Sequence, residues 1–224
     1  TPYVTYGLMA ANILIFLGYV PLFESPRALF DFWQVWAFVP AELSSGRGVY
    51  TLVTSQFLHG GWMHLAGNML FLFIFGDNIE DELGHIRYLG FYLLCGICAA
   101  LAQYLAGPTS QVPLVGASGA IAGVMGGYLL LFPKARVDIL IIFIIFFRIF
   151  PIPAWIMLCL WFAMQFLGGL GSSGDEGGVA YWAHAGGFVV GALLLLPHWL
   201  NRGGAGFWAQ NAGQPPHPEA RYTR

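Results

Sequence analysis

Residues 115–132 read VGASGAIAGVMGGYLLLF, a run of 18 residues without a charged side chain. The hydrocarbon core of a bilayer is about 30 Å thick and is crossed by about 20 mainly apolar residues in a helix, so the run comes close to a full span. Gly119, Gly123 and Gly127 recur every four residues, a spacing that lets a second helix approach closely. The run therefore predicts a tightly packed transmembrane helix, with Ser118 within a turn of its beginning.

A second run, residues 179–200, carries the matching small residues Ala183, Gly187 and Gly191. Small residues on both surfaces favour direct packing of the two helices. His184 lies just over one turn into this second run. Close packing would bring its side chain within hydrogen-bonding reach of Ser118.

Four more runs qualify as spans, namely residues 3–23, 60–76, 88–107 and 152–170. The predicted fold class is therefore an all-α membrane protein, a bundle of six transmembrane helices. A long loop, residues 24–59, joins the first two. Its tryptophans stand among mixed polar and apolar residues, which is typical of the membrane interface.

A further apolar insert occupies residues 137–150, but its apolar core, Val137 to Phe147, is short for a span. We expect it to be interfacial or re-entrant. If it crossed the membrane, His184 would move to the opposite half of the bilayer from Ser118, so the count of six and a shared site depend on each other.

The composition excludes several classes of protein. With 58% hydrophobic and 9% charged residues, the chain has too little polar surface for a water-soluble globule of 224 residues. A net charge of −2 does not suggest nucleic-acid binding. Cys95, Cys98 and Cys159 lie in apolar runs, where we expect small apolar packing residues and no disulfide or metal site.

The basic residues predict the orientation, because cytoplasmic loops carry an excess of Lys and Arg. The loops on the side of the C-terminus carry Arg87, Lys134, Arg136, Arg148, Arg202, Arg221 and Arg224, against Arg27 and Arg47 on the other side. Both termini are therefore predicted to be cytoplasmic. We expect a membrane domain over residues 1–200, followed by a Gly-, Pro- and Gln-rich cytoplasmic tail, 201–224, that is disordered.

Four polar residues inside the spans need a reason, because polar groups in the membrane are costly. His64 and Asn68 lie one turn apart on one face of the second span. Together with Ser118 and His184 they lie on helices that enter from the outer side, at depths of roughly 5 to 15 Å. Taken one at a time, each has another explanation. Ser118 alone suits a packing residue, and the His64 and Asn68 pair suits a hydrogen-bonded link between helices. A histidine such as His184 suits a proton or ion site. Read together, the four favour one site.

Four segments resemble motifs of the rhomboid family of intramembrane serine proteases. Gly116-Ala117-Ser118-Gly119 is similar to its serine motif, His64-Leu65-Ala66-Gly67-Asn68 to its His-x-x-x-Asn motif, and Ala183-His184-Ala185-Gly186-Gly187 to its base motif. Glu80-x-x-x-Gly84 resembles a structural motif of the family. The order and spacing resemble a prokaryotic six-helix rhomboid over nearly the whole chain.

The resemblance implies an endopeptidase in which Ser118 is the nucleophile and His184 the general base and acid. His64, Asn68 and the Ser118 backbone N–H are candidates to stabilise the oxyanion. Gly116, Gly119 and Gly187 support the motifs. Because the spans near His184 contain no Asp or Glu, we expect a dyad.

The implied substrates are transmembrane proteins in the lipid bilayer, and no cofactor, metal or nucleic acid is expected. The implied location is a bacterial inner membrane, with the site opening to the outer side.

Two features depart from the family pattern. Tyr50-Thr51 stands where many relatives have Trp-Arg, and Ala122 replaces a frequent aromatic residue that would pack on the histidine.

Two alternative functions stay open: a small transporter with a polar pathway, and an inactive rhomboid-like binding protein.

Overall fold

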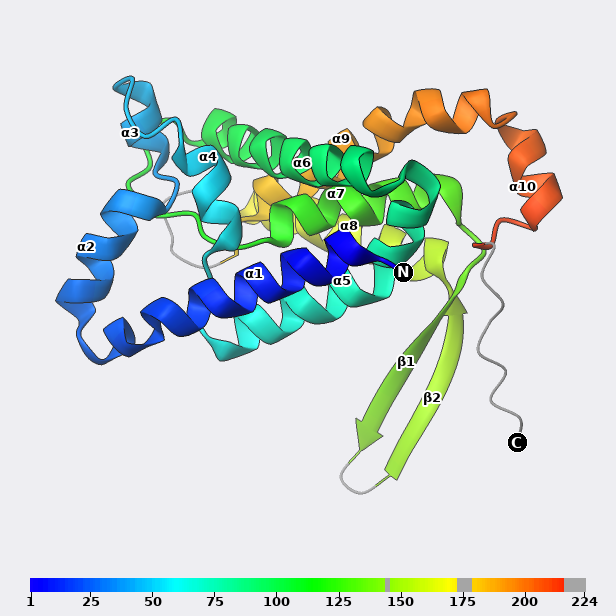
Figure 1. Cartoon of the computed structure of the whole chain (residues 1–224), viewed down its shortest axis with the longest axis horizontal. Helices are drawn as coiled ribbons and strands as arrows, with labels where there is room; N and C mark the ends of the chain where they lie inside the picture. Colours follow the sequence, from blue (N-terminus) through cyan, green and yellow to red (C-terminus); the bar gives the residue numbers. More distant parts are fainter. Residues whose placement is uncertain (144–145, 173–178, 216–224) are drawn as a thin grey trace.

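The computed structural model describes residues 1–143, 146–172 and 179–215. Its main body is a bundle of long helices that run roughly side by side (Figure 1). They are α1 (Tyr3–Tyr19), α5 (Trp62–Leu83), α6 (His85–Ala106), α7 (Ser118–Leu131), α8 (Ala154–Gly171) and α9 (Tyr181–Asn201). The prediction of a helical membrane bundle is confirmed.

The helices differ in their fitness to cross a membrane. By length and composition, α1 with its extension η1 (Val20–Glu24), α6, α8 and α9 each qualify. α5 qualifies together with the short helices before it, across a bend of 95°. α7 is apolar but has only 14 residues. The protein is therefore a multi-pass membrane protein, and the count of six crossings stays a prediction.

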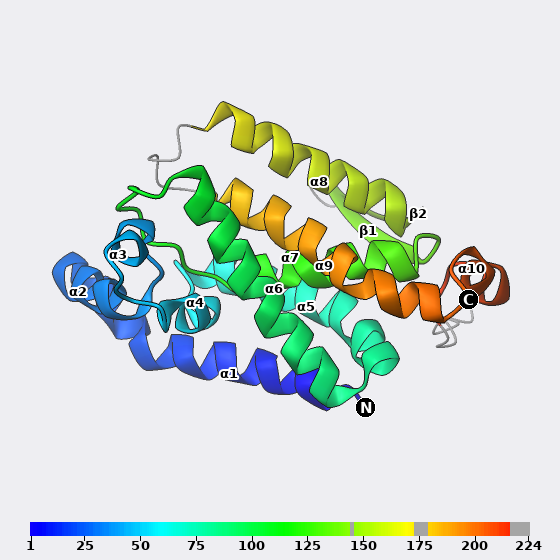
Figure 2. The same cartoon turned by 90° about the horizontal axis from the view of Figure 1, so that it is seen from above.

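α7 is the central helix of the bundle. It packs against α9, α6, α5 and α8, and every residue from Gly119 to Tyr128 is buried. α8 lies at one edge and α1 at the opposite edge (Figure 2). The predicted close packing of α7 on α9 is present: a Cβ atom on Gly126 would overlap the carbonyl oxygen of Phe188, and one on Gly191 that of Gly123.

The loop between α1 and α5 is folded. It forms α2 (Pro26–Trp36), α3 (Pro40–Ser44), α4 (Thr51–Thr54) and the 3-10 turn η2 (Ser55–Phe57). The Tyr50 hydroxyl donates to the carbonyl of Val35 at 2.7 Å, and the Thr54 hydroxyl to that of Trp36 at 2.7 Å. These bonds hold the end of α2, so this chain anchors the loop without a Trp-Arg pair.

Glu80 ties together the end of the bundle at which α1 begins and α5 ends. Its buried carboxylate accepts bonds from the Val4 and Thr5 amides at 2.8 and 2.7 Å and from the Thr5 hydroxyl at 2.7 Å. Val4 and Thr5 lie in the first turn of α1, whose amides lack partners within the helix. A negative group also suits the positive end of the helix dipole. Gly84, at φ +74°, makes the turn from α5 to α6.

The apolar insert is a β-hairpin, where the sequence predicted an interfacial or re-entrant segment of an all-α chain. β1 (Arg136–Phe143) pairs antiparallel with β2 (Phe146–Pro153), with Arg136 opposite Pro153. The hairpin projects away from the helices (Figure 1). A run rich in isoleucine and phenylalanine suits a strand. The Ala154 amide donates to Ala135 at 2.7 Å and so closes the base.

Part of the predicted disordered tail is folded. α9 continues to Asn201, and α10 (Ala205–Asn211) docks on the end of α7. Phe207 is 4% exposed, and the Trp208 indole N–H donates to the carbonyl of Leu130 at 3.0 Å. The prediction of disorder is therefore wrong for residues 205–211. Residues 216–224 of the tail lie outside the described residues.

Candidate active site

Ser118 is the first residue of α7 and follows a sharp change of backbone direction. The preceding segment is extended, and Leu114 exchanges two backbone hydrogen bonds with Phe38. Gly116 then takes φ +134°, a conformation that other residues rarely adopt. A Cβ atom there would lie 2.9 Å from His64 Nε2. Glycine is thus required both for the turn and for the approach of His64.

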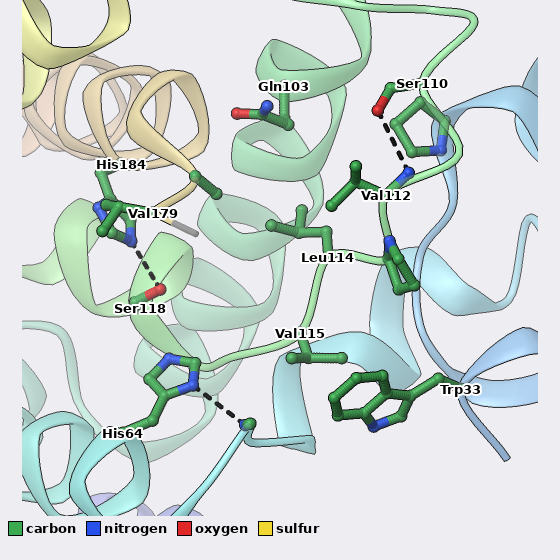
Figure 3. Close-up of a pocket in the computed structure, with 14 residues that line it drawn as sticks. Trp33, His64, Gln103, Ser110, Val112, Leu114, Val115, Ser118, Val179 and His184 are labelled. Carbon is green, nitrogen blue, oxygen red and sulfur yellow. Dashed lines mark hydrogen bonds between the residues drawn. The ribbon is translucent and has the colours of Figure 1, made fainter. Parts of the chain in front are cut away.

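His184 lies in the first turn of α9 and meets Ser118 directly. Its Nε2 atom is 2.8 Å from Ser118 Oγ (Figure 3). The pair is positioned by backbone packing, because a Cβ atom on Gly187 would overlap the carbonyl oxygen of Gly119. A Cβ atom on Gly119 would itself lie 2.6 Å from the Ala99 Cβ. The structure thus brings the two predicted catalytic side chains together.

α8 contributes two contacts to His184 that sequence reasoning missed. The imidazole Nδ1 lies 2.8 Å from Gln165 Oε1. The Trp161 ring lies 5.8 Å from the imidazole, centroid to centroid, at an interplanar angle of 34°. The aromatic contact that Ala122 cannot make therefore comes from another helix. The available signal was that Gln165 is the one strongly polar side chain in the apolar run 154–171.

His64 faces the same site from the first turn of α5. The Gly60 backbone N–H donates to His64 Nδ1 at 3.1 Å. An imidazole nitrogen that accepts carries no hydrogen, so the hydrogen of the neutral ring is on Nε2. That N–H lies on the side of Gly116 and Ser118, where it can donate to an oxyanion.

Asn68 differs from the other predicted residues. Its amide Nδ2 donates to the carbonyl of His64 at 2.8 Å, within α5, and the side chain is buried. It is not among the described residues that line the cavity at Ser118. The structure therefore does not bring Asn68 into the cavity with the other three.

The cavity in front of Ser118 has a volume of about 610 Å³. Its polar lining includes Ser118, His64, His184, Gln103 and Ser110, and its apolar lining includes Val112, Leu114, Val115 and Val179 (Figure 3). Its walls come from the first loop, the extended segment before α7, and the beginning of α9.

A metal-based site has no support among the residues that the structure describes. In those parts of the chain, no group of three or more His, Cys, Asp or Glu side chains is arranged to hold a metal ion. Cys95 and Cys98 are free thiols in α6, and Cys159 is a free thiol in α8.

Comparison with known proteins places these motifs in a family. The model of the Rhomboid domain matches residues 46–200, which is more than half of the chain. The chain belongs to the rhomboid family. This match includes the serine, the base and the His-x-x-x-Asn motifs.

Individual relatives come from plants, yeast and bacteria. Rhomboid-like protein 11, chloroplastic, of Arabidopsis thaliana is 43% identical over 74 residues, or 33% of this chain and 26% of its own. Rhomboid protein 1, mitochondrial, of Saccharomyces cerevisiae is 30% identical over 179 residues, or 74% of this chain and 49% of its own. Rhomboid protease GluP of Bacillus subtilis is 40% identical over 80 residues, or 36% of this chain and 15% of its own. The chain thus spans about half or less of each of these rhomboid relatives.

Proposed function

We propose that this rhomboid protein is an intramembrane serine endopeptidase that hydrolyses peptide bonds in or near transmembrane segments, with Ser118 and His184 as a catalytic dyad. The observation that carries the proposal is the distance of 2.8 Å between Ser118 Oγ and His184 Nε2 at the wall of a cavity. A serine hydroxyl is a weak nucleophile until an adjacent base takes its proton. An inactive scaffold or a transporter has no need of this pair.

The first half of the reaction forms an acyl-enzyme. Ser118 Oγ attacks the peptide carbonyl carbon while its proton passes to His184 Nε2. The tetrahedral intermediate then expels the amine, which takes the proton from His184. In the second half, water attacks the ester carbonyl carbon while one of its protons passes to His184 Nε2. The second tetrahedral intermediate then expels Ser118 Oγ, which takes that proton back from His184, and the new carboxyl end is released.

The oxyanion formed in each half requires hydrogen-bond donors. The Ser118 amide is the first in α7 and has no partner within the helix, and the His64 Nε2–H faces the same place. Each such donor contributes about 10²- to 10³-fold to the rate. The Asn68 amide is bonded to the His64 carbonyl within α5 and lies outside the described lining of the cavity, so we do not count it among the donors.

The substrates of this proposed activity are membrane proteins with a helix that unwinds near the outer face. A peptide bond in an intact helix is shielded by its own hydrogen bonds and cannot reach Ser118.

We further propose that the chain crosses a bacterial inner membrane six times, with both termini in the cytoplasm and the cavity open to the outer side. The excess of Lys and Arg in the predicted cytoplasmic loops and the bacterial relative support this location.

Labelling by a fluorophosphonate probe tests the dyad. The wild-type protein is expected to be labelled, while Ser118→Ala and His184→Ala are expected to lose labelling and cleavage of a transmembrane substrate. Thermal unfolding of each variant in detergent controls for loss of fold. A folded wild type that is not labelled, or labelling that survives in Ser118→Ala, would count against the dyad and favour a transporter or an inactive scaffold.

A further inference from the structure

Gln165 is a polar side chain in a place where polarity is costly. It is 9% exposed, on a helix whose other side chains are almost all apolar. Burying an amide without a hydrogen-bond partner is unfavourable. Its carbonyl oxygen is directed at His184 Nδ1, 2.8 Å away. This bond gives the buried amide oxygen a partner.

The bond also determines which nitrogen of His184 can act as a base. In a neutral imidazole one nitrogen carries the hydrogen and the other a lone pair. A carboxamide oxygen only accepts, so the bond requires the hydrogen on Nδ1. The lone pair is then on Nε2, which faces the Ser118 hydroxyl at 2.8 Å. With the opposite tautomer, Nε2 carries a hydrogen and cannot take the serine proton.

Trp161 restrains the ring in a second direction. It precedes Gln165 by four residues, so both side chains project from one face of α8. The indole packs over the imidazole at 5.8 Å, and the amide bonds the edge of the same ring. One face of one helix thus sets both the tilt and the rotation of His184.

We propose that Gln165 is a positioning residue that holds His184 in the tautomer able to accept the Ser118 proton, with Trp161 restraining the ring. This inference rests on the proposed protease function. Gln165 stands where soluble serine proteases have a carboxylate, and it orients the base without a charge.

Two variants separate orientation from packing. Gln165→Leu keeps the bulk but removes the acceptor, and we expect the rate of fluorophosphonate labelling to fall about 10- to 100-fold, the loss typical of a misplaced catalytic group. Gln165→Glu restores an acceptor, and we expect it to recover most of the rate. Its carboxylate should move the acid limb of the pH profile to higher pH, because it favours the charged imidazole. His64 on α5 also titrates at the site and is the same in both variants.

The matched control is Met164→Leu, the neighbour of Gln165 on α8, which is 60% exposed. Its labelling rate and pH profile should equal those of the wild type. If Gln165→Leu is labelled at the wild-type rate, or if Gln165→Glu is as slow as Gln165→Leu with an unmoved acid limb, the proposal is wrong.

A readout independent of activity separates this inference from the proposed function. The ¹⁵N shifts of His184 in histidine-labelled protein, assigned with His184→Ala, report which nitrogen carries the hydrogen. We expect hydrogen on Nδ1 in the wild type and a mixture of tautomers in Gln165→Leu. Hydrogen on Nε2 in the wild type would overturn the inference. An unlabelled wild type with the expected tautomer would instead contradict the protease function and leave the role of Gln165 supported.

Discussion

Two of the helices that pack on α9, namely α7 and α8, meet it through different kinds of contact. α7 meets α9 backbone to backbone: a Cβ atom on Gly126, Gly187 or Gly191 would overlap a carbonyl oxygen of the facing helix. α8 meets α9 through aromatic side chains. A Cβ atom on Gly168 would lie 2.5 Å from the Tyr181 ring, and one on Gly169 2.9 Å from the Trp182 ring.

The difference separates two tasks. The rigid contact fixes the distance between the backbones of Ser118 and His184, because peptide groups have no rotamers with which to yield. The side-chain contact orients the His184 ring through Gln165 and Trp161. This contact is easier to displace, because rings and amides can change rotamer. The attacking pair is therefore built on the part of the bundle that deforms least, while its alignment depends on a part that can shift.

The largest effect should follow from a methyl group at the rigid contact. Gly191→Ala forces α9 away from the Gly123 carbonyl, and overpacking against immobile atoms costs about 3 kcal/mol or more. We expect the thermal midpoint in detergent to fall by about 6 °C or more, with loss of probe labelling. If Gly191→Ala has the thermal midpoint of the wild type, the contact between α7 and α9 is not rigid, and the contrast with the contact between α8 and α9 fails.

A smaller effect should follow at the side-chain contact. In Gly168→Ala the new methyl group meets the Tyr181 ring, which can rotate away, so we expect a loss of about 1 kcal/mol. The labelling rate should fall a few-fold, because a displaced α8 moves Gln165 relative to His184. In Gly168→Ala the labelling rate should therefore fall clearly while the thermal midpoint falls only slightly. A loss of stability equal to that of Gly191→Ala would show that α8 is as rigidly held as α7.

The smallest effect should follow where nothing faces the glycine. Gly90 in α6 is exposed, and a Cβ atom added to it would have no neighbouring atom within 4 Å. Gly90→Ala should raise stability by at most about 1 kcal/mol, since alanine is the better helix former. The midpoint should stay or rise slightly, and labelling should not change. A fall as large as that of Gly168→Ala would mean that any added methyl group is harmful, and the contrast between contacts would fail.

Local patterns in the sequence predicted much of the molecule. The helices follow from runs of apolar residues, and the contact between α7 and α9 follows from small residues every four positions. The meeting of Ser118, His184 and His64 follows from their positions near the beginnings of predicted helices that start at the same end of the bundle. Helical period and apolar length are properties of neighbouring residues, so they can be read along the chain.

Other features were decided by contacts between distant segments. An apolar run such as residues 137–147 suits a strand as well as a helix, and its pairing partner made it a hairpin. In the predicted tail, residues 205–211 form a helix because Phe207 packs near Phe132 at the end of α7. The Asn68 amide found its partner within its own helix instead of the cavity.

The sequence by itself determined the membrane bundle, the family motifs and the candidate nucleophile and base. Only the tertiary structure decided that α8 supplies the partners of His184. Gln165 lies 19 residues before His184, on a helix at the edge of the bundle, and no local pattern joins them. A buried polar group must find a partner wherever the packed chain brings one within hydrogen-bonding distance, and that depends on how the helices pack in three dimensions.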